Sequence, residues 1–164
     1  MITKLKPELN RFPLNMPVRL FVRSGRPKSY KLPSLFFTMK LFKTNIEKEV
    51  LKNNYFRRVL FTGKYEQLFA MTLKPKEEIG NEVHKKVDQF FRIEQGEAKF
   101  VLFNGKKTYT AKTDDAVIVP AGTWHNVINT SKTKKLKLYT IYSPPNHKPN
   151  TIHKTKEEAE LAEH

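Results

Sequence analysis

Residues 80–96, GNEVHKKVDQFFRIEQG, and residues 114–129, DDAVIVPAGTWHNVIN, decide the fold of this chain. Each stretch combines a short apolar run with turn residues and with polar side chains that can bind a metal ion. In the second stretch the run at 115–119 ends at the turn Pro120-Ala121-Gly122, and residues 125–129 resume the strand pattern. Short apolar runs bounded by Pro and Gly are typical of strands in an all-β domain.

Four side chains in these stretches are candidate metal ligands. Glu82 and His84 are two residues apart, so both point to one face if Val83 lies in a strand. Gln89 and His125 could complete a ring of oxygen and nitrogen donors. Two imidazoles, one carboxylate and one amide oxygen suit Fe(II), Mn(II), Ni(II) or Zn(II). These residues alone make the four side chains candidate ligands of one divalent metal ion, with a site that has lost its metal as the alternative.

The two stretches together resemble the paired motifs of the cupin superfamily. The first is similar to His-x-His, three or four residues, Glu, six residues, Gly; the second is similar to Gly-x5-Pro-x-Gly-x2-His-x3-Asn, with Asp114 in place of the opening Gly. The resemblance covers roughly residues 56–145. It implies an all-β fold, the cupin double-stranded β-helix or jelly-roll barrel, with an extended N-terminal arm and short peripheral helices around it.

The motif positions also depart from the cupin pattern. Glu82 stands where the family usually has its first His, and Gln89 stands where it has Glu. The resulting ligand set is similar in composition to that of cupin-type phosphomannose isomerases, with Glu and Gln interchanged. The resemblance thus implies a metal-dependent isomerase, lyase or oxygenase acting on a small polar compound such as a sugar or a carbonyl acid. Whether the chain is an enzyme stays open at this stage.

Other residues are candidates for the pocket around the ion. Phe91 and Ile93 share the face of Gln89 by strand alternation and are expected to form its wall. Tyr139 and Tyr142 are an odd number of residues apart on the expected last strand, so their side chains point to opposite faces. At most one of them faces the pocket as a proton donor. Arg58, expected just before the first barrel strand together with Arg57, could bind a carboxylate or phosphate if it enters the mouth. His147 and His153 follow the barrel, and we expect them to be exposed.

The strand pattern extends outward from the two motifs. We expect strands at residues 66–73, 89–94, 99–103, 107–110, 115–119, 125–129 and 136–142. Asn104-Gly105 favours a type I′ hairpin turn. Capping boxes at Thr44-Asn45-Ile46-Glu47 and Thr155-Lys156-Glu157-Glu158 predict a helix ending near residue 53 and a short C-terminal helix docked outside the barrel. The expected parts are a basic arm at 1–43 that contains Pro and aromatic residues, a barrel at 44–145, and a C-terminal tail at 146–164.

The N-terminal arm carries most of the excess positive charge. The whole chain has a net charge of +15, and residues 1–46 hold ten Lys and Arg but only one acid, Glu8. Simple solvation, organelle targeting and contact with an acidic partner are all compatible with this pattern. A non-catalytic subunit, anchored by this arm to nucleic acid or protein, is therefore the alternative function. The residues expected to make that contact are Arg11, Arg19, Arg23, Arg26, Lys28 and Lys31.

Composition limits the remaining possibilities. The chain has no Cys, which excludes disulfides, thiolate metal sites and a thiol nucleophile. No apolar run reaches the roughly 18 residues that a membrane span needs, and the N-terminus lacks the apolar core of a secretory signal. We expect a soluble intracellular protein, cytoplasmic or mitochondrial, that binds no membrane and forms a homodimer or joins a larger complex.

Overall fold

The computed structural model describes residues 41–163. The predicted arm contacts at Arg11, Arg19, Arg23, Arg26, Lys28 and Lys31 lie outside the described residues. Within them the chain forms two helices and nine strands, in the order α1 (Ile46–Lys52), β1 (Arg57–Thr62), β2 (Gln67–Leu73), β3 (Asp88–Gln95), β4 (Glu97–Leu102), β5 (Lys107–Lys112), β6 (Ala116–Val119), β7 (His125–Asn129), β8 (Leu136–Ser143), β9 (Ile152–His153) and α2 (Lys156–Glu163). Neither helix has the length and apolar character needed to cross a bilayer.

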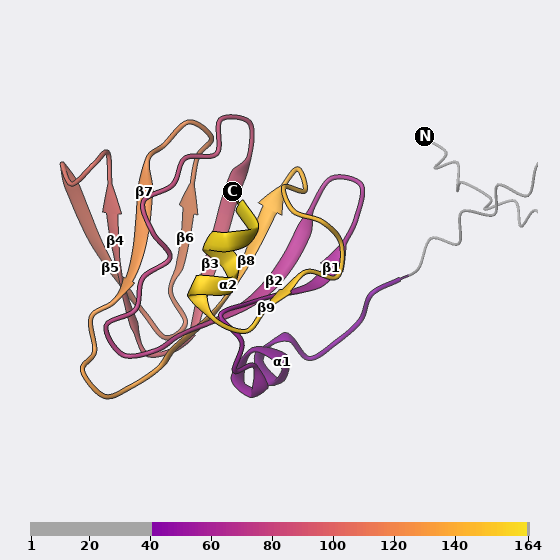
Figure 1. The fold of residues 1–164 in the computed structure, drawn as a ribbon, viewed down its shortest axis with the longest axis horizontal. Coiled ribbons are helices and arrows are strands. Elements are labelled where there is room, and N and C mark those ends of the chain that lie inside the picture. Colours follow the sequence, from indigo (N-terminus) through magenta and orange to yellow (C-terminus); the bar gives the residue numbers. More distant parts are fainter. Residues whose placement is uncertain (1–40, 164) are drawn as a thin grey trace, which may run out of the picture. The chain divides into compact units, whose positions relative to one another are not determined.

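The strands form two antiparallel sheets, which confirms the predicted all-β jelly roll (Figure 1). The larger sheet has the order β6-β3-β8-β2-β1-β9, and the smaller one has the order β5-β4-β7. All the strand pairs are antiparallel. The smaller sheet is too narrow to cover the larger one completely, so part of the inner face of the larger sheet must be covered by other segments.

Residues 77–84 extend the smaller sheet along β7. The backbone of Glu82 exchanges two hydrogen bonds of 2.9 Å with that of His125, and Ile79 donates to Val127 at 2.9 Å. The backbone N–H of Gly122 donates to the carbonyl of His84, also at 2.9 Å. This irregular segment therefore behaves as a short additional strand, which fixes Glu82 and His84 beside the start of β7.

Side chains between the two sheets form the core. The inward residues of β3, which include Phe91 and Ile93, are fully buried. The Phe91 ring packs edge-on against the ring of Phe100 in β4, with 5.3 Å between the ring centres. Phe69 and Tyr142 pack in the same way at 5.0 Å. Burial of each such side chain stabilises the fold by about 1.5–3 kcal/mol, so this core holds the two sheets, and the residues between them, in place.

Several turn residues have positive φ angles, including two residues of the second motif. Asn104 and Gly105 have φ of 55° and 93°, as the predicted type I′ turn requires. Asp114, which replaces the expected Gly, has φ of 74°, and Gly122 has φ of 78°. Asp tolerates the left-handed region better than most residues, so the replacement keeps the turn before β6.

Two local expectations differ from the structure. The cap of α1 is Asn45, whose side chain accepts from the N–H of Lys48, rather than Thr44. Arg57 and Arg58 do not precede the first strand but begin β1. The C-terminal helix is peripheral, as expected, and Ala159 is its buried residue. The short strand β9 before it pairs with β1.

Candidate metal centre

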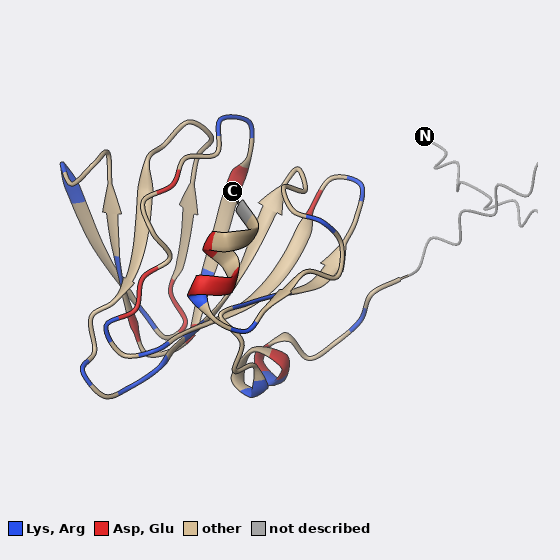
Figure 2. Ribbon diagram, viewed as in Figure 1, with Lys and Arg blue, Asp and Glu red and all other residues tan. Residues whose placement is uncertain are grey.

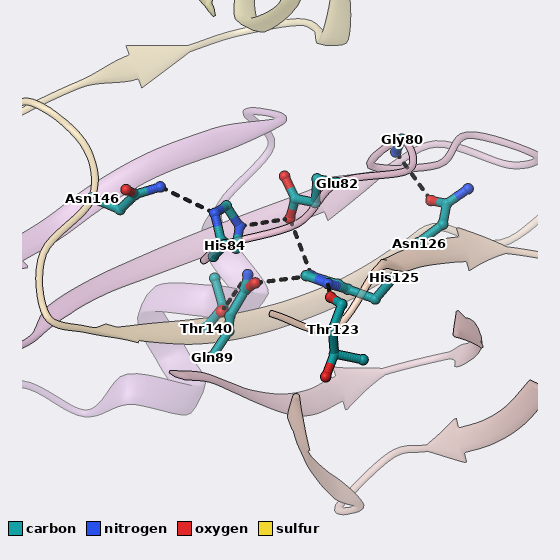
Figure 3. Close-up of polar contacts among 9 residues, drawn as sticks. All are labelled: Gly80, Glu82, His84, Gln89, Thr123, His125, Asn126, Thr140 and Asn146. Carbon is teal, nitrogen blue, oxygen red and sulfur yellow. Dashed lines mark hydrogen bonds and ion pairs between the residues drawn. The ribbon is translucent and has the colours of Figure 1, made fainter. Parts of the chain in front are cut away.

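Four donor atoms converge between the two sheets (Figure 3). Glu82 Oε1 lies 3.2 Å from His84 Nε2 and 3.3 Å from His125 Nε2, and His125 Nε2 lies 3.0 Å from Gln89 Oε1. The ligand atoms of Glu82, His84 and His125 all lie within 4.8 Å of one another. The structure thus brings together the four side chains that the sequence predicted would share an ion.

The backbone determines the tautomer of His125. Its Nδ1 lies 3.0 Å from the carbonyl oxygen of Thr123, and because a carbonyl only accepts, Nδ1 carries the proton. The neutral ring therefore presents a lone pair at Nε2. This nitrogen is directed at the carboxylate of Glu82 and the amide of Gln89, and the ring is 1% exposed.

The orientation of Gln89 follows from a contact with β8. Its Nε2 donates to Thr140 Oγ1 at 3.2 Å, which directs Oε1 toward His125. Gln89 is fully buried and lies on β3, between β6 and β8. The amide oxygen of Gln89 and the carboxylate of Glu82 both accept, so Nε2 of His125 faces them either as the N–H of a protonated ring or as a lone pair with a cation among the three groups.

His84 is held by residues near the C-terminus. Its Nδ1 lies 3.2 Å from the side-chain amide of Asn146, and its ring packs edge-on against Tyr142 at 5.2 Å. The amide nitrogen Nδ2 of Asn146 is the atom that faces Nδ1 in the structure; the flipped amide, with Oδ1 toward Nδ1, would accept the proton of Nδ1 and leave the Nε2 lone pair for an ion. His84 Nε2 and Glu82 Oε1 are buried, and apart from the contacts within this group of donors they have no hydrogen-bond partner among residues 41–162.

Glu82 stays ionised far into the acid range. Burial raises the pKa of its carboxyl group, but the adjacent imidazoles of His125 and His84 lower it by more, and the pKa falls from 4.5 to about 2. The centre therefore offers one fixed negative charge beside two imidazoles. A divalent ion requires such a donor set, and the two buried atoms that lack hydrogen bonds outside this group are where it would bind. The residues present fit a metal ion.

A pocket of about 450 Å³ opens beside the centre. Glu82 and His84 line one side of it, and the C-terminal segment lines the other, through residues that include Asn146, Lys148, Thr151 and His153. This volume is in the range of binding sites for small molecules. A ligand in this pocket would have direct access to the converging donor atoms.

The other predicted site residues occupy different places. Phe91 and Ile93 lie on the face of Gln89, and the Phe91 ring is 6.1 Å from the His125 ring. Of the two tyrosines, Tyr142 contacts His84, whereas Tyr139 packs against Phe90, 5.8 Å between ring centres. Tyr142 is thus the tyrosine with access to the site.

The basic candidates lie in different places. Arg58, a weak candidate for the mouth, lies instead at the surface, with its guanidinium 3.8 Å from Glu49 of α1. His147 and His153 are not simply exposed. The His147 ring packs edge-on against Phe69 and Tyr142, and both histidines line the pocket. They come near the site because the chain turns back over the larger sheet after β8.

Sequence reasoning missed Thr123, Thr140 and Asn146, the three residues that orient the donors. Thr123 acts through its carbonyl group, for which the side chain gives no signal. Thr140 could have been found from its inward parity on the strand at 136–142, which is that of Tyr142. Asn146 follows Pro144-Pro145 and lies outside both motifs, so only the fold shows its relation to His84.

The sequence is similar to a family model and to two known proteins. A family model described as "Cupin domain" matches residues 69–142. The chain is 48% identical over 128 residues to the uncharacterized protein YrkC of Bacillus subtilis (strain 168), and the match covers 76% of this chain and 68% of that protein. It is also 47% identical over 113 residues to the uncharacterized protein L612 of Acanthamoeba polyphaga mimivirus, with 68% of this chain and 71% of that protein covered.

The fold is also similar to that of solved structures. BH2720 from Bacillus halodurans is 40% identical, with a TM-score of 0.73, and the match covers 76% of this chain and 97% of that one. The cupin domain of Schizosaccharomyces pombe Cnp3 is 20% identical, with a TM-score of 0.53, and covers 58% of this chain and 67% of that one. The second likeness concerns the fold alone.

Proposed function

The chain belongs to the cupin superfamily, and from this premise we propose that it binds one divalent transition-metal ion and uses it to transform a small polar molecule. The observation that carries the proposal is the convergence of four donor atoms, two of which are buried without a hydrogen bond outside this group. Without an ion, these contacts are satisfied only when the imidazoles carry a proton at Nε2, so a metal ion and these protons compete for the same positions.

Each residue has a distinct part in this proposal. Glu82 supplies the charge, His84 and His125 supply neutral nitrogen donors, and Gln89 supplies a neutral oxygen. Fe(II), Mn(II), Ni(II) and Zn(II) accept such a set. When bound, the ion would polarise a carbonyl oxygen or lower the pKa of a water molecule.

The surrounding side chains restrict what can reach the donors. Phe91 and Tyr142 pack against the imidazoles of His125 and His84 and exclude bulk water from that side of the centre. A substrate would therefore approach from the 450 Å³ pocket. The size of the pocket and its polar lining favour a sugar or a carbonyl acid, and the reaction classes that fit are isomerisation, lyase chemistry and oxygenation.

Metal analysis of the full chain, purified without chelators, tests the first part of the proposal. We expect close to one transition-metal ion per chain, and loss of that ion in His84→Ala and His125→Ala. Lys99→Ala, at an exposed position of β4, is the control and should keep the ion. Absence of stoichiometric metal, even after incubation with excess Zn²⁺, Mn²⁺, Ni²⁺ or Fe²⁺, would refute the proposal.

A turnover assay tests the second part. The metal-loaded protein is incubated with sugars and carbonyl acids, and the mixtures are followed by NMR for products that the His125→Ala variant does not form. If a compound binds the metal-loaded protein and is recovered unchanged, the chain is a binding module rather than an enzyme.

A further inference from the structure

The pocket beside the metal centre has two chemically different sides. One side consists of Glu82 and His84, and the other comes from the C-terminal segment between β8 and α2. Among the described side chains, Glu82 is the only carboxylate that lines the pocket, and its charge is directed at the two imidazoles. The remaining polar lining is basic or neutral, with Lys148 as its one Lys or Arg side chain.

We infer that the C-terminal segment forms an oxyanion-binding subsite centred on Lys148, so that the molecule taken by this site carries a carboxylate or phosphate group. The inference rests on the proposed function, because it assigns the substrate class of the same pocket. No carboxylate among residues 41–162, whose side chains the structure describes, forms an ion pair with Lys148. Its charge is therefore available to a ligand.

Residues 144–153 hold Lys148 but no acid. In Figure 2 the loop between β8 and β9 accordingly shows basic but no acidic colour, whereas the acids of the C-terminal segment lie on α2. The negative charge of an incoming anion would thus meet no opposing carboxylate on this side of the pocket. A cationic ligand would be repelled by Lys148, and a neutral ligand would gain a hydrogen bond but no charge attraction from it.

The backbone around Lys148 is fixed by a buried side chain of the larger sheet. Gln67 Oε1 accepts from the backbone N–H groups of Asn146 and His147 at 3.2 and 3.0 Å, and Gln67 Nε2 donates to the carbonyl of His147 at 2.9 Å. Gln67 is fully buried. The segment is therefore held in place before a ligand arrives, which reduces the entropy lost on binding.

A second set of bonds fixes the segment beyond Lys148. Thr151 Oγ1 donates to the carbonyl of Lys148 at 2.7 Å, and the N–H of Val59 in β1 donates to the carbonyl of Thr151 at 2.9 Å. Lys148 thus lies in a loop tied to the sheet on both sides, while its own side chain is free to reach an anion. A lysine binds an oxyanion as a point charge, so both carboxylates and phosphates are suitable.

Calorimetric titration of the full-length, Zn²⁺-loaded protein tests this inference. The probes are succinate, inorganic phosphate and the neutral analogue succinamide. We expect one or both anions to bind, succinamide to bind at least about tenfold more weakly, and Lys148→Met to weaken anion binding by about tenfold or more. Lys148→Arg should restore most of the affinity. Lys154→Met, which removes an exposed lysine outside the pocket lining, is the matched control and should change little.

The outcomes separate this inference from the proposed function. Equal binding of succinate and succinamide, or unchanged anion affinity in Lys148→Met, would overturn the anion subsite. The same Lys148→Met protein should keep its full zinc content, since Lys148 is not a proposed ligand. Loss of zinc in wild-type protein would instead count against the metal centre, whatever the anions do. Whether succinate or phosphate binds more tightly tells which anionic group the subsite prefers.

Discussion

Glu82 and His125 contact each other twice, once through their backbones and once through their side chains. The backbones exchange two hydrogen bonds of 2.9 Å, and the carboxylate oxygen lies 3.3 Å from the imidazole Nε2. The backbone pairing fixes both side chains on the same side of the smaller sheet. The convergence of ligands is therefore built into strand pairing and does not depend on the rotamer of a mobile loop.

Gln89 gives the sharpest test of the donor set. Replacing it by Glu adds a second negative charge next to the ion, so Gln89→Glu should bind Zn²⁺ on the order of tenfold more tightly. The metal-free variant should unfold at lower temperature than wild type, because two carboxylates then lie close together in a buried site. Competition with a chelating dye and thermal unfolding in EDTA measure the two effects. Gln95→Glu, at an exposed position of β3, is the control; equal zinc affinity in the two variants would argue against Gln89 as a ligand.

The depressed pKa of Glu82 predicts how stability depends on pH. A carboxyl whose pKa drops from 4.5 to about 2 on folding adds stability that is complete above pH 4.5 and is lost as the pH falls toward 2. For this shift the contribution is on the order of 3 kcal/mol. Glu82→Gln should therefore flatten the pH dependence of the unfolding free energy in that range, measured with urea on metal-free protein. Glu97→Gln, at an exposed position of β4, should leave the pH profile unchanged.

Asn146 is predicted to position His84 for metal binding. Asn146→Leu removes the amide that contacts His84 Nδ1 and, once flipped, would accept Nδ1–H. It should lower zinc affinity by about tenfold or more, because residues that orient ligating histidines have effects of this size. Asn146→Asp keeps an acceptor and should restore the affinity. Zinc titrations of both variants decide the matter: the prediction fails if Leu and Asp have the same effect.

Lys137 is predicted to stabilise the fold without any role at the site. It is 7% exposed, and its ammonium group donates to the backbone carbonyls of Leu51 and Asn53 at the C-terminal end of α1. Lys137→Met leaves these carbonyls without their charged donor and should reduce the free energy of unfolding by about 2 kcal/mol. Lys135→Met, at an exposed lysine nearby, should cost less than about 0.5 kcal/mol. Urea unfolding of the two variants gives the comparison, and zinc binding should be the same in both.

Most strands could be predicted because their signals are local. The runs at 89–94, 125–129 and 136–142 have strand length and end at turn residues, and the structure has β3, β7 and β8 there. β1 and β9 were not recognised as strands. β1 begins with two arginines, and β9 has only two residues, so neither has an alternating apolar pattern long enough to read. Both strands exist because a neighbouring strand supplies their hydrogen bonds.

The amino-acid sequence alone determined the class of fold and the four donor residues, since motif spacing and strand alternation are properties of the chain that need no coordinates. The tertiary structure decided which groups orient those donors and what faces them across the pocket. Asn146 and Lys148 reach the site only because the chain folds back over the larger sheet after β8, on the anchor that Gln67 provides. These contacts join residues about 80 positions apart in the sequence. No local pattern in residues 144–163 predicts them, because they depend on the packing of the whole domain.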